Sequence, residues 1–382
     1  NKSIPKEKKP QFSYTVYADV TDITGETHST KGNVQVGYVA LTANIAIREN
    51  ILKEETTDFK IITNNLNGEF EAATGTIKIE LLETPTLLYQ NRKWANPDYF
   101  ILEEAEFKKD FPTLAFKAED KTHNWKVKKT ALTVSFDSKK SKKLDLKDIN
   151  NWDQGAYKVT MNTKDKYGVA IEVIKYFNLY SQKALEIPSN NALFVANSYI
   201  TAEPGETLSI DFGSFDKNAW ILYEVEHEGK LVSSEWVQPQ GRKRYEIAIE
   251  EKHRGNLYFH ATMILNNRYY KKAGTINVPW TNKELTIEYS TFRDKLKPGQ
   301  EEEWRVKISG PKKDKVAAEL LAGMYDASLD VFAANNWYLN LNQYNSMMLS
   351  CKIGNGFNTK VATLITGRNW NSDTPSGQFH SY

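Results

Sequence analysis

The sequence predicts an all-β protein built from several β-sandwich modules in tandem. Tyr and Phe, which favour pleated and half-buried surfaces, occur 20 and 17 times among 382 residues. Apolar and polar residues alternate in many short runs, and turn-forming pairs that contain Gly separate these runs. Such alternation is typical of strands with one face in a core and the other face in water.

The alternating runs occur along most of the chain. Clear examples are residues 12–20, 76–82, 157–163 and 245–249. The turn signals between runs include Thr24-Gly25, Asn67-Gly68, Pro204-Gly205, Glu228-Gly229 and Pro298-Gly299. Many short strands joined by such turns indicate sandwiches or barrels rather than a mixed α/β fold.

One stretch, residues 85–130, interrupts this rhythm. Within it, the segment from Asp98 to Lys109 has acidic residues early and lysines late, which favours a helix with Asp98 as its N-cap. The helix is expected to end before Pro112. We therefore predict a partly helical insertion inside one sandwich.

A Pro-Gly turn that leads into a strand occurs twice, and the two copies are about one sandwich length apart. Pro204-Gly205 precedes one alternating run, and Pro298-Gly299 precedes another. We expect each turn to open an early strand of its own module, with Gly205 and Gly299 supplying a conformation that other residues disfavour. The repeat predicts tandem copies of one module.

Candidate linkers near residue 37, at residues 186–190 and at residues 278–282 divide the chain. The expected parts are terminal strands of a preceding module (1–37), a sandwich with the insertion (38–185), a second sandwich (186–279) and a third (280–382). The first part has too few strands to be stable alone. The chain begins with Asn1 rather than Met, which favours a processed protein or a piece of a longer one.

Composition excludes several classes of function. The net charge is +2, so nothing indicates the dense basic face of a nucleic-acid-binding protein. No apolar run approaches the ~20 residues that a membrane-spanning helix needs. The single cysteine, Cys351, excludes a disulfide framework and a multi-cysteine zinc site.

The sequence also lacks a recognisable catalytic arrangement. None of the six histidines has the spacing of a metal site, and Cys351 has no neighbouring base. Asp326 and Asp330 are the best local pair of carboxylates, yet nothing else supports acid–base chemistry there. We therefore expect a protein that is not an enzyme, with no catalytic residue, cofactor or metal.

Tryptophans near likely loops leave a sugar-binding platform open as an alternative. These residues are Trp94, Trp125, Trp152, Trp337 and Trp370. Aromatic rings that fill a core or a module interface are commoner than exposed stacking platforms.

The third part of the chain resembles the bacterial branch of the alpha-2-macroglobulin family. The resemblance lies in residues 278–288, in the Pro-Gly-Gln turn at 298–300 followed by Trp304, and in the Asp-Ala-Ser-Leu sequence that begins at Asp326. Residues 199–208 are similar to the start of the preceding domain of that family, and 14–37 and 61–79 to earlier ones. The resemblance implies macroglobulin domains, which are immunoglobulin-like or fibronectin-like sandwiches.

Members of that family trap proteases by means of a cleaved bait segment and, in some, a Cys-Gly-Glu-Gln thioester. Cys351 is followed by Lys352, so no thioester is carried over. The resemblance implies a structural segment of a protease trap in the bacterial periplasm or at the cell surface. Its partners would be the remaining domains of the same polypeptide and target proteases, through a bait region outside the chain or near its C-terminal end.

Two other functions remain open: a surface adhesin or carbohydrate-binding module, and an enzyme with scattered carboxylates. An adhesin predicts coplanar exposed aromatic rings, and an enzyme predicts two carboxylates facing across a cleft. The scaffold function predicts no pocket with convergent polar groups. It also fits a strand over residues 322–331 that points Tyr325, Leu329 and Val331 into the core and uses Asp326 as a structural clamp on the other face.

Overall fold

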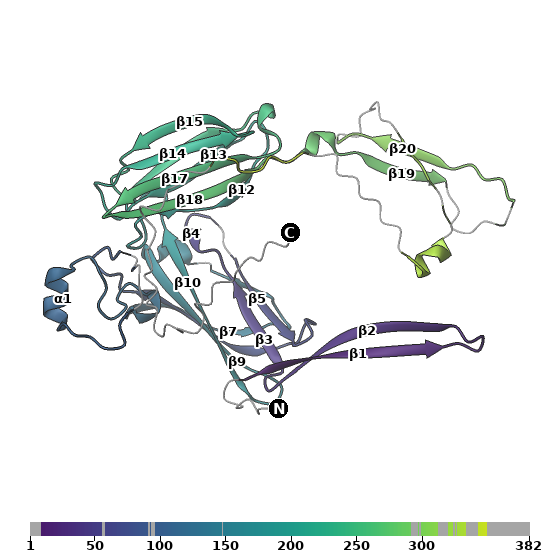
Figure 1. Ribbon diagram of the computed structural model, residues 1–382, viewed down its shortest axis with the longest axis horizontal. Coiled ribbons are helices and arrows are strands. Elements are labelled where there is room, and N and C mark those ends of the chain that lie inside the picture. Colours follow the sequence, from purple (N-terminus) through teal and green to yellow (C-terminus); the bar gives the residue numbers. More distant parts are fainter. Residues whose placement is uncertain are drawn as a thin grey trace, which may run out of the picture.

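The computed structural model describes most of the chain. The described residues are 9–55, 58–90, 92, 96–146, 148–291, 297, 299–311, 320–323, 325, 327–333 and 343–349. Within them, strands provide nearly all of the regular structure and form, in chain order, a hairpin, two sandwiches and a second hairpin (Figure 1). The predicted all-β class is confirmed.

The first hairpin consists of β1 (Gln11–Thr21) and β2 (Thr27–Gly37), which pair antiparallel along their whole length. The Asp22 carboxylate closes the turn, because its Oδ1 accepts hydrogen bonds from the backbone N–H groups of Thr24 and Glu26. Every residue of β1 is exposed, and Figure 1 shows the hairpin extending away from the sandwiches. The hairpin therefore adds little to either sandwich core.

The first sandwich packs a five-stranded sheet, in the order β4-β10-β9-β6-β7, against a three-stranded sheet, in the order β3-β5-β8. Its strands are β3 (Leu41–Ala46), β4 (Asn50–Leu52), β5 (Asp58–Asn65), β6 (Thr74–Leu82), β7 (Val127–Asp137), β8 (Lys143–Asp145), β9 (Gly155–Lys164) and β10 (Ala170–Tyr180). Inward-facing residues of these strands form the core. At its centre the rings of Phe59 and Tyr157 pack against Phe177, with centroids 5.4 and 5.1 Å away.

The second sandwich repeats this strand order one for one, with sheets β12-β18-β17-β14-β15 and β11-β13-β16. Its strands are β11 (Phe194–Val195), β12 (Tyr199–Thr201), β13 (Thr207–Gly213), β14 (Ile221–His227), β15 (Lys230–Val237), β16 (Arg242–Ala248), β17 (Leu257–Leu265) and β18 (Arg268–Asn277). In its core the rings of Phe212 and Tyr223 stack in parallel, 4.7 Å apart. The two sandwiches are thus two copies of one topology.

The insertion lies between β6 and β7, where the second sandwich has only the tight turn between β14 and β15. It contains a helix, α1 (Glu104–Asp110), a 3₁₀ turn, η2 (Thr122–Asn124), and a small core of its own. This core consists of Phe107, Leu114 and Phe116 with Phe100 and Leu102 packed against them.

The helix is shorter than the segment from Asp98 to Lys109 that was expected. Asp98 does not cap it, because the residue before the helix is Glu103 in an extended conformation. Phe100 and Leu102 pack on the small core, whereas Tyr99 and Ile101 are 79% and 88% exposed. That period of two is the pattern of an extended segment, and it overrides the favourable charges.

The last described part contains a second hairpin, β19 (Thr286–Thr291) and β20 (Arg305–Ser309), and a 3₁₀ helix, η6 (Ala327–Val331). Two further 3₁₀ turns lie in the sandwiches, η3 (Ile149–Asn151) and η4 (Glu251–His253), and a third, η5 (Thr281–Lys283), precedes β19. In the part of the chain that the structure describes, no helix has the length and apolar character to cross a bilayer.

The strand expected over residues 322–331 is wrong for its second half. Residues 327–331 form η6, and the side chains of Leu329 and Val331, expected in the core, are 53% and 75% exposed. The Tyr325 hydroxyl donates to the Asp330 carboxylate at 2.9 Å, so side chain and backbone close a local turn. Asp326 itself lies outside the described residues.

Candidate functional site

The junction between the two sandwiches is organised around Arg242, at the start of β16. Its Nη1 lies 3.0 Å from Asp211 Oδ2, and both side chains are at most 5% exposed. Its Nη2 donates to the backbone carbonyls of Ser181, Gln182 and Ala184, in the chain that leaves the first sandwich. One guanidinium therefore neutralises a buried carboxylate and anchors the connecting segment.

Asp211 also binds Arg244, which keeps its charge paired on a second side. The Arg244 Nε and Nη2 atoms lie 3.0 and 2.8 Å from the two carboxylate oxygens. This hydrogen-bonded pairing raises the pKa of Arg244 further. The bidentate geometry fixes Asp211 and so fixes the direction in which it presents charge to Arg242.

A second set of contacts joins the sandwiches from the other side. Asn50, on β4, donates through Nδ2 to the carbonyl oxygens of Val195 and Ala196, both at 3.1 Å. Its Oδ1 accepts from Asn178 at 2.9 Å, so this buried amide is satisfied at both ends. The ring of Tyr180 meets Phe194 edge-on beside it.

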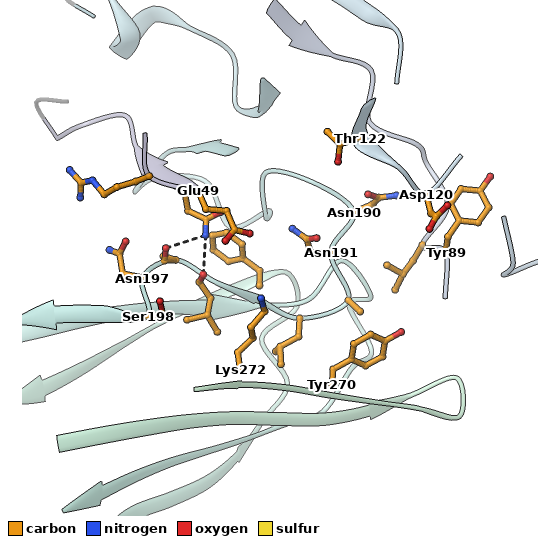
Figure 2. Close-up of a pocket in the computed structure, with 18 of the residues that line it drawn as sticks. Glu49, Tyr89, Asp120, Thr122, Asn190, Asn191, Asn197, Ser198, Tyr270 and Lys272 are labelled. Atoms are coloured by element: carbon orange, nitrogen blue, oxygen red, sulfur yellow. Dashed lines mark hydrogen bonds between the residues drawn. The ribbon is translucent and has the colours of Figure 1, made fainter. Parts of the chain in front are cut away.

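A groove of about 520 Å³ opens next to this junction, and residues of both sandwiches and of the insertion line it. Figure 2 shows the Lys272 ammonium reaching toward Asn191 and Glu49, with Tyr89 and Asp120 at the far side of the view. Arginine, lysine, carboxylate and amide groups are mixed, so no single sign of charge dominates. The groove is suited to a polar ligand.

Several groove residues are held by their own hydrogen bonds. Asn190 donates to Leu87 O at 3.0 Å, and Lys121 pairs with Asp120 at 2.7 Å. Trp125, one of the five tryptophans singled out above, lines the groove and donates to Glu119 O at 2.9 Å. These bonds fix the shape of the wall.

Two phenols of the groove, Tyr89 and Tyr270, have a raised pKa, so each keeps its proton at physiological pH. Burial, reinforced by the carboxylate of Glu119, raises the pKa of Tyr89. Burial also raises the pKa of Tyr270.

The two carboxylates of the lining, Glu49 and Asp120, lie at opposite sides of the view in Figure 2, and Asp120 is already paired with Lys121.

The Pro-Gly turns lie away from this groove. Gly205 has a φ of +95° in the turn that leads into β13, and its N–H donates to Ile249 O at 2.8 Å. Gly299 has a φ of +74° and precedes β20. Pro204 begins the first turn, and Pro298 lies outside the described residues, as do Asp326 and Cys351.

Of the five tryptophans, the two that the structure describes lie in different places. Trp152 stacks on Tyr157 of the first sandwich, 5.5 Å between centroids, and Trp125 belongs to the groove. Trp94, Trp337 and Trp370 lie outside the described residues. In the part that the structure describes, no three His, Cys, Asp or Glu side chains cluster as metal ligands would.

Sequence reasoning missed the junction residues, Asn50, Asp211 and Arg242. A faint signal existed, because Arg242 and Arg244 alternate on one strand and a lone Asp sits between Ile210 and Phe212 on its neighbour. The contacts with residues 181–184 bridge some 60 positions of sequence, so no local pattern reveals them.

Comparison with known proteins gives a similarity of fold. No protein-family model matches the chain, and no curated protein matches it. Among solved structures, the chain is similar to alpha-2-macroglobulin of E. coli in its native conformation, at 13% identity over 72% of this chain and 20% of the other, with a TM-score of 0.20. The alpha-2-macroglobulin of Salmonella reacted with methylamine gives 10% identity, 72% and 19% coverage, and a TM-score of 0.21.

Repeats of adhesion proteins are similar to the same extent. A tetra-tandem repeat from the extending region of a large adhesion protein gives 14% identity, 74% and 60% coverage, and a TM-score of 0.19. The chain spans about a fifth of the length of the macroglobulins that it matches. At these identities the likeness concerns β-sandwich architecture and carries no argument on function.

Proposed function

We propose that this chain is a non-enzymatic scaffold segment of an extracellular or envelope protein, in which sandwich modules are held at a fixed mutual angle. The junction around Arg242 carries this proposal. A flexible linker would leave its carbonyl groups in water, whereas here one buried guanidinium binds three of them and a buried carboxylate. Rotation of one sandwich against the other would pull these carbonyls away from the guanidinium and leave them without their donor, which is costly.

The finer proposal is a segment of a protease trap of the alpha-2-macroglobulin type. It is supported by the resemblance of residues 278–288, 298–300 and the Asp-Ala-Ser-Leu sequence beginning at Asp326. Scaffold domains of such a trap position a bait segment and the rest of the polypeptide. The isolated chain is then expected neither to cleave nor to inhibit proteases. Stoichiometric inhibition or turnover in a panel of proteases would contradict this.

The test of the scaffold proposal is the distance between the sandwiches. Spin labels at Lys139 in the first sandwich and Glu246 in the second, in a chain with Cys351→Ser, should give one narrow distance distribution by pulsed electron resonance. Arg242→Met should broaden it. Arg305→Met, which removes an exposed ion pair with Glu303, is the control and should leave it narrow. A broad distribution in the unaltered chain would refute a rigid junction.

The groove favours a second candidate, a carbohydrate-binding module of an adhesin. Sugars bind through aromatic faces and through amide, carboxylate and ammonium groups, and the lining offers Trp125, Tyr270, Asn191 and Lys272. A glycan array decides this candidate. The candidate would be established if a glycan binds the unaltered chain, if Tyr270→Ala abolishes this binding, and if Tyr167→Ala preserves it. Tyr167 is the control because it is an exposed tyrosine outside the groove. If the chain binds no glycan on the array, the carbohydrate-binding function is ruled out.

A further inference from the structure

The central strands of the five-stranded sheet in the second sandwich are buried on both faces. On β17, Leu257 and Phe259 point into the core and are fully buried, as expected for one face of a sandwich sheet. Tyr258, His260 and Thr262 alternate with them and point to the outer face, yet they are only 7%, 2% and 9% exposed. An outer face normally meets water, so something covers these polar residues.

A short segment, residues 343–349, lies against this face beside Tyr258 and Glu226, and we name it the latch. Five hydrogen bonds join it to the sandwich and the chain that follows, and each uses a backbone atom of the latch. They run from Trp280 Nε1 to Gln343 O (2.9 Å), from Asn345 N to Gly255 O (2.7 Å), from Tyr258 Oη to Asn345 O, from Met348 N to Glu226 Oε1 (2.7 Å) and from Leu349 N to Glu226 Oε2 (3.0 Å).

Glu226, on β14, is the centre of this interface. It is fully buried, and its two oxygens accept the N–H groups of Met348 and Leu349 separately. The same Oε2 accepts from His260 Nε2 at 3.0 Å. Without the latch, a carboxylate on this face would have one protein partner and would have to be hydrated. The interface is therefore built to accept two consecutive main-chain N–H groups at this position.

The glycines beside the latch permit its close approach. A Cβ atom on Gly255, whose φ is +86°, would lie 2.7 Å from the carbonyl oxygen of Gln343. A Cβ atom on Gly229, whose φ is +72°, would lie 2.9 Å from the sulfur of Met348. Both turns thus present backbone alone to the latch, where a larger residue would push it away.

We infer that this outer face is a docking surface for a polypeptide segment, that residues 343–349 of the same chain are its occupant, and that Glu226 holds them. Because all five hydrogen bonds use main-chain atoms of the latch, the surface selects a backbone that directs two consecutive N–H groups at Glu226 rather than particular side chains. The latch goes beyond the scaffold proposal: it fastens chain that follows the second hairpin back onto the second sandwich.

Two substitutions within the latch test this inference without disturbing the sandwich. Met348→Pro removes the N–H that Glu226 Oε1 accepts, whereas Met348→Ala keeps it and shortens only the side chain. Hydrogen exchange of the full chain, read by mass spectrometry over residues 343–349, should speed up at least about tenfold in the Pro variant and much less in the Ala variant. Equal exchange in the two variants, or an unprotected latch in the unaltered chain, would overturn the inference.

A substitution in the surface gives the reciprocal test. Glu226→Gln replaces one acceptor oxygen by a donor, so the latch amides should exchange at least about tenfold faster. Glu224→Gln, two residues earlier on the same strand, is the matched control. Exchange of the β13 amides reports whether the sandwich itself has stayed folded. Fast latch exchange with a protected β13 supports the inference, and a latch as protected as in the control contradicts it.

Acid should release the latch as well. Burial alone would raise the pKa of Glu226, but the hydrogen bonds from the Met348 amide, the His260 ring and the Leu349 amide outweigh burial and leave the pKa below its ordinary 4.5. The ionised carboxylate therefore favours the docked latch above that value, and docking weakens as the pH falls through the lowered pKa.

The groups around Glu226 allow this response to be assigned. The neighbours of Glu226 in the sheet are Leu231 on β15 and Tyr258 on β17, and His260 on β17 forms a hydrogen bond with it. The latch contributes its backbone amides. His260 is thus the titratable side chain that forms a hydrogen bond with Glu226. Latch exchange, corrected for intrinsic rate, should rise between pH 5 and pH 3 and should be flat in Glu226→Gln. A response that persists in that variant would assign the release to another group.

Discussion

Arg242 shows how a single residue can decide the geometry of two domains. A buried guanidinium costs free energy unless its donors are matched, and here a carboxylate and three carbonyls partner its two terminal nitrogens, whereas Nε has no partner. Arg rather than Lys is needed, because a planar fork can serve several acceptors in different directions. The residue acts on its own strand and on residues some 60 positions earlier.

Loss of the Arg242 side chain should destabilise the folded protein. We expect Arg242→Met to lower the free energy of unfolding by about 3 kcal/mol, since Asp211 and the carbonyls stay buried with fewer partners. Urea denaturation followed by fluorescence measures it. The exposed Arg305→Met variant should change the same quantity by at most about 0.5 kcal/mol. Equal midpoints for the two variants would show that the junction bonds contribute nothing.

At the scale of elements, most strands and the presence of a helix in the insertion were predictable, whereas the start of α1 and the helical turn η6 were not. Alternation of apolar residues depends only on neighbours, so β6, β9 and β16 follow from local sequence. The helix was predicted to begin near Asp98 because the charge pattern was given more importance than the alternation that places Phe100 and Leu102 on one side of the chain. At η6 the Tyr325–Asp330 hydrogen bond and the lack of β-branched residues before Val331 favour a turn.

Close strand packing gives a prediction at this scale. A Cβ atom on Gly75, in β6, would lie 2.1 Å from the carbonyl oxygen of Asn162 on β9. The backbone of β9 can move away only by distorting its hydrogen bonds. Gly75→Ala should therefore cost about 2–3 kcal/mol of stability through overpacking. Gly32→Ala is the matched control, because Gly32 also lies in a strand and has nothing within 4 Å of the added carbon. Thermal unfolding of both variants in parallel checks this, and similar melting temperatures would contradict it.

At the scale of the molecule, the repeat of one topology was indicated by the sequence, whereas the contacts between copies were not. The Pro-Gly turns pointed to tandem modules, and the two sandwiches share one strand order. The module boundaries stay predictions. The hydrogen bonds of the junction and the latch join residues 61 to 145 positions apart, and the groove is lined by both sandwiches, so these features depend on how finished modules meet.

Modular construction predicts that the first hairpin is dispensable for the rest. Its strands are largely exposed, and its described bonds to the first sandwich are few, such as Gln35 N to Asn67 Oδ1 and Lys9 Nζ to Ala170 O. A chain without residues 1–37 should keep the stability of the first sandwich within about 1 kcal/mol. Calorimetry on both chains measures this. Loss of the first sandwich's transition would mean that the hairpin is part of its core.

The parallel pairing at the edge of each larger sheet has a mechanical consequence. In both sandwiches an early strand lies parallel to the final one, β4 beside β10 and β12 beside β18. Tension on the two ends of a module pulls such neighbours in opposite directions along their length. All hydrogen bonds of the ladder then bear the load together, instead of opening one at a time as in an antiparallel hairpin pulled from its open end. We therefore expect each sandwich to resist stretching more strongly than an antiparallel hairpin of the same length would.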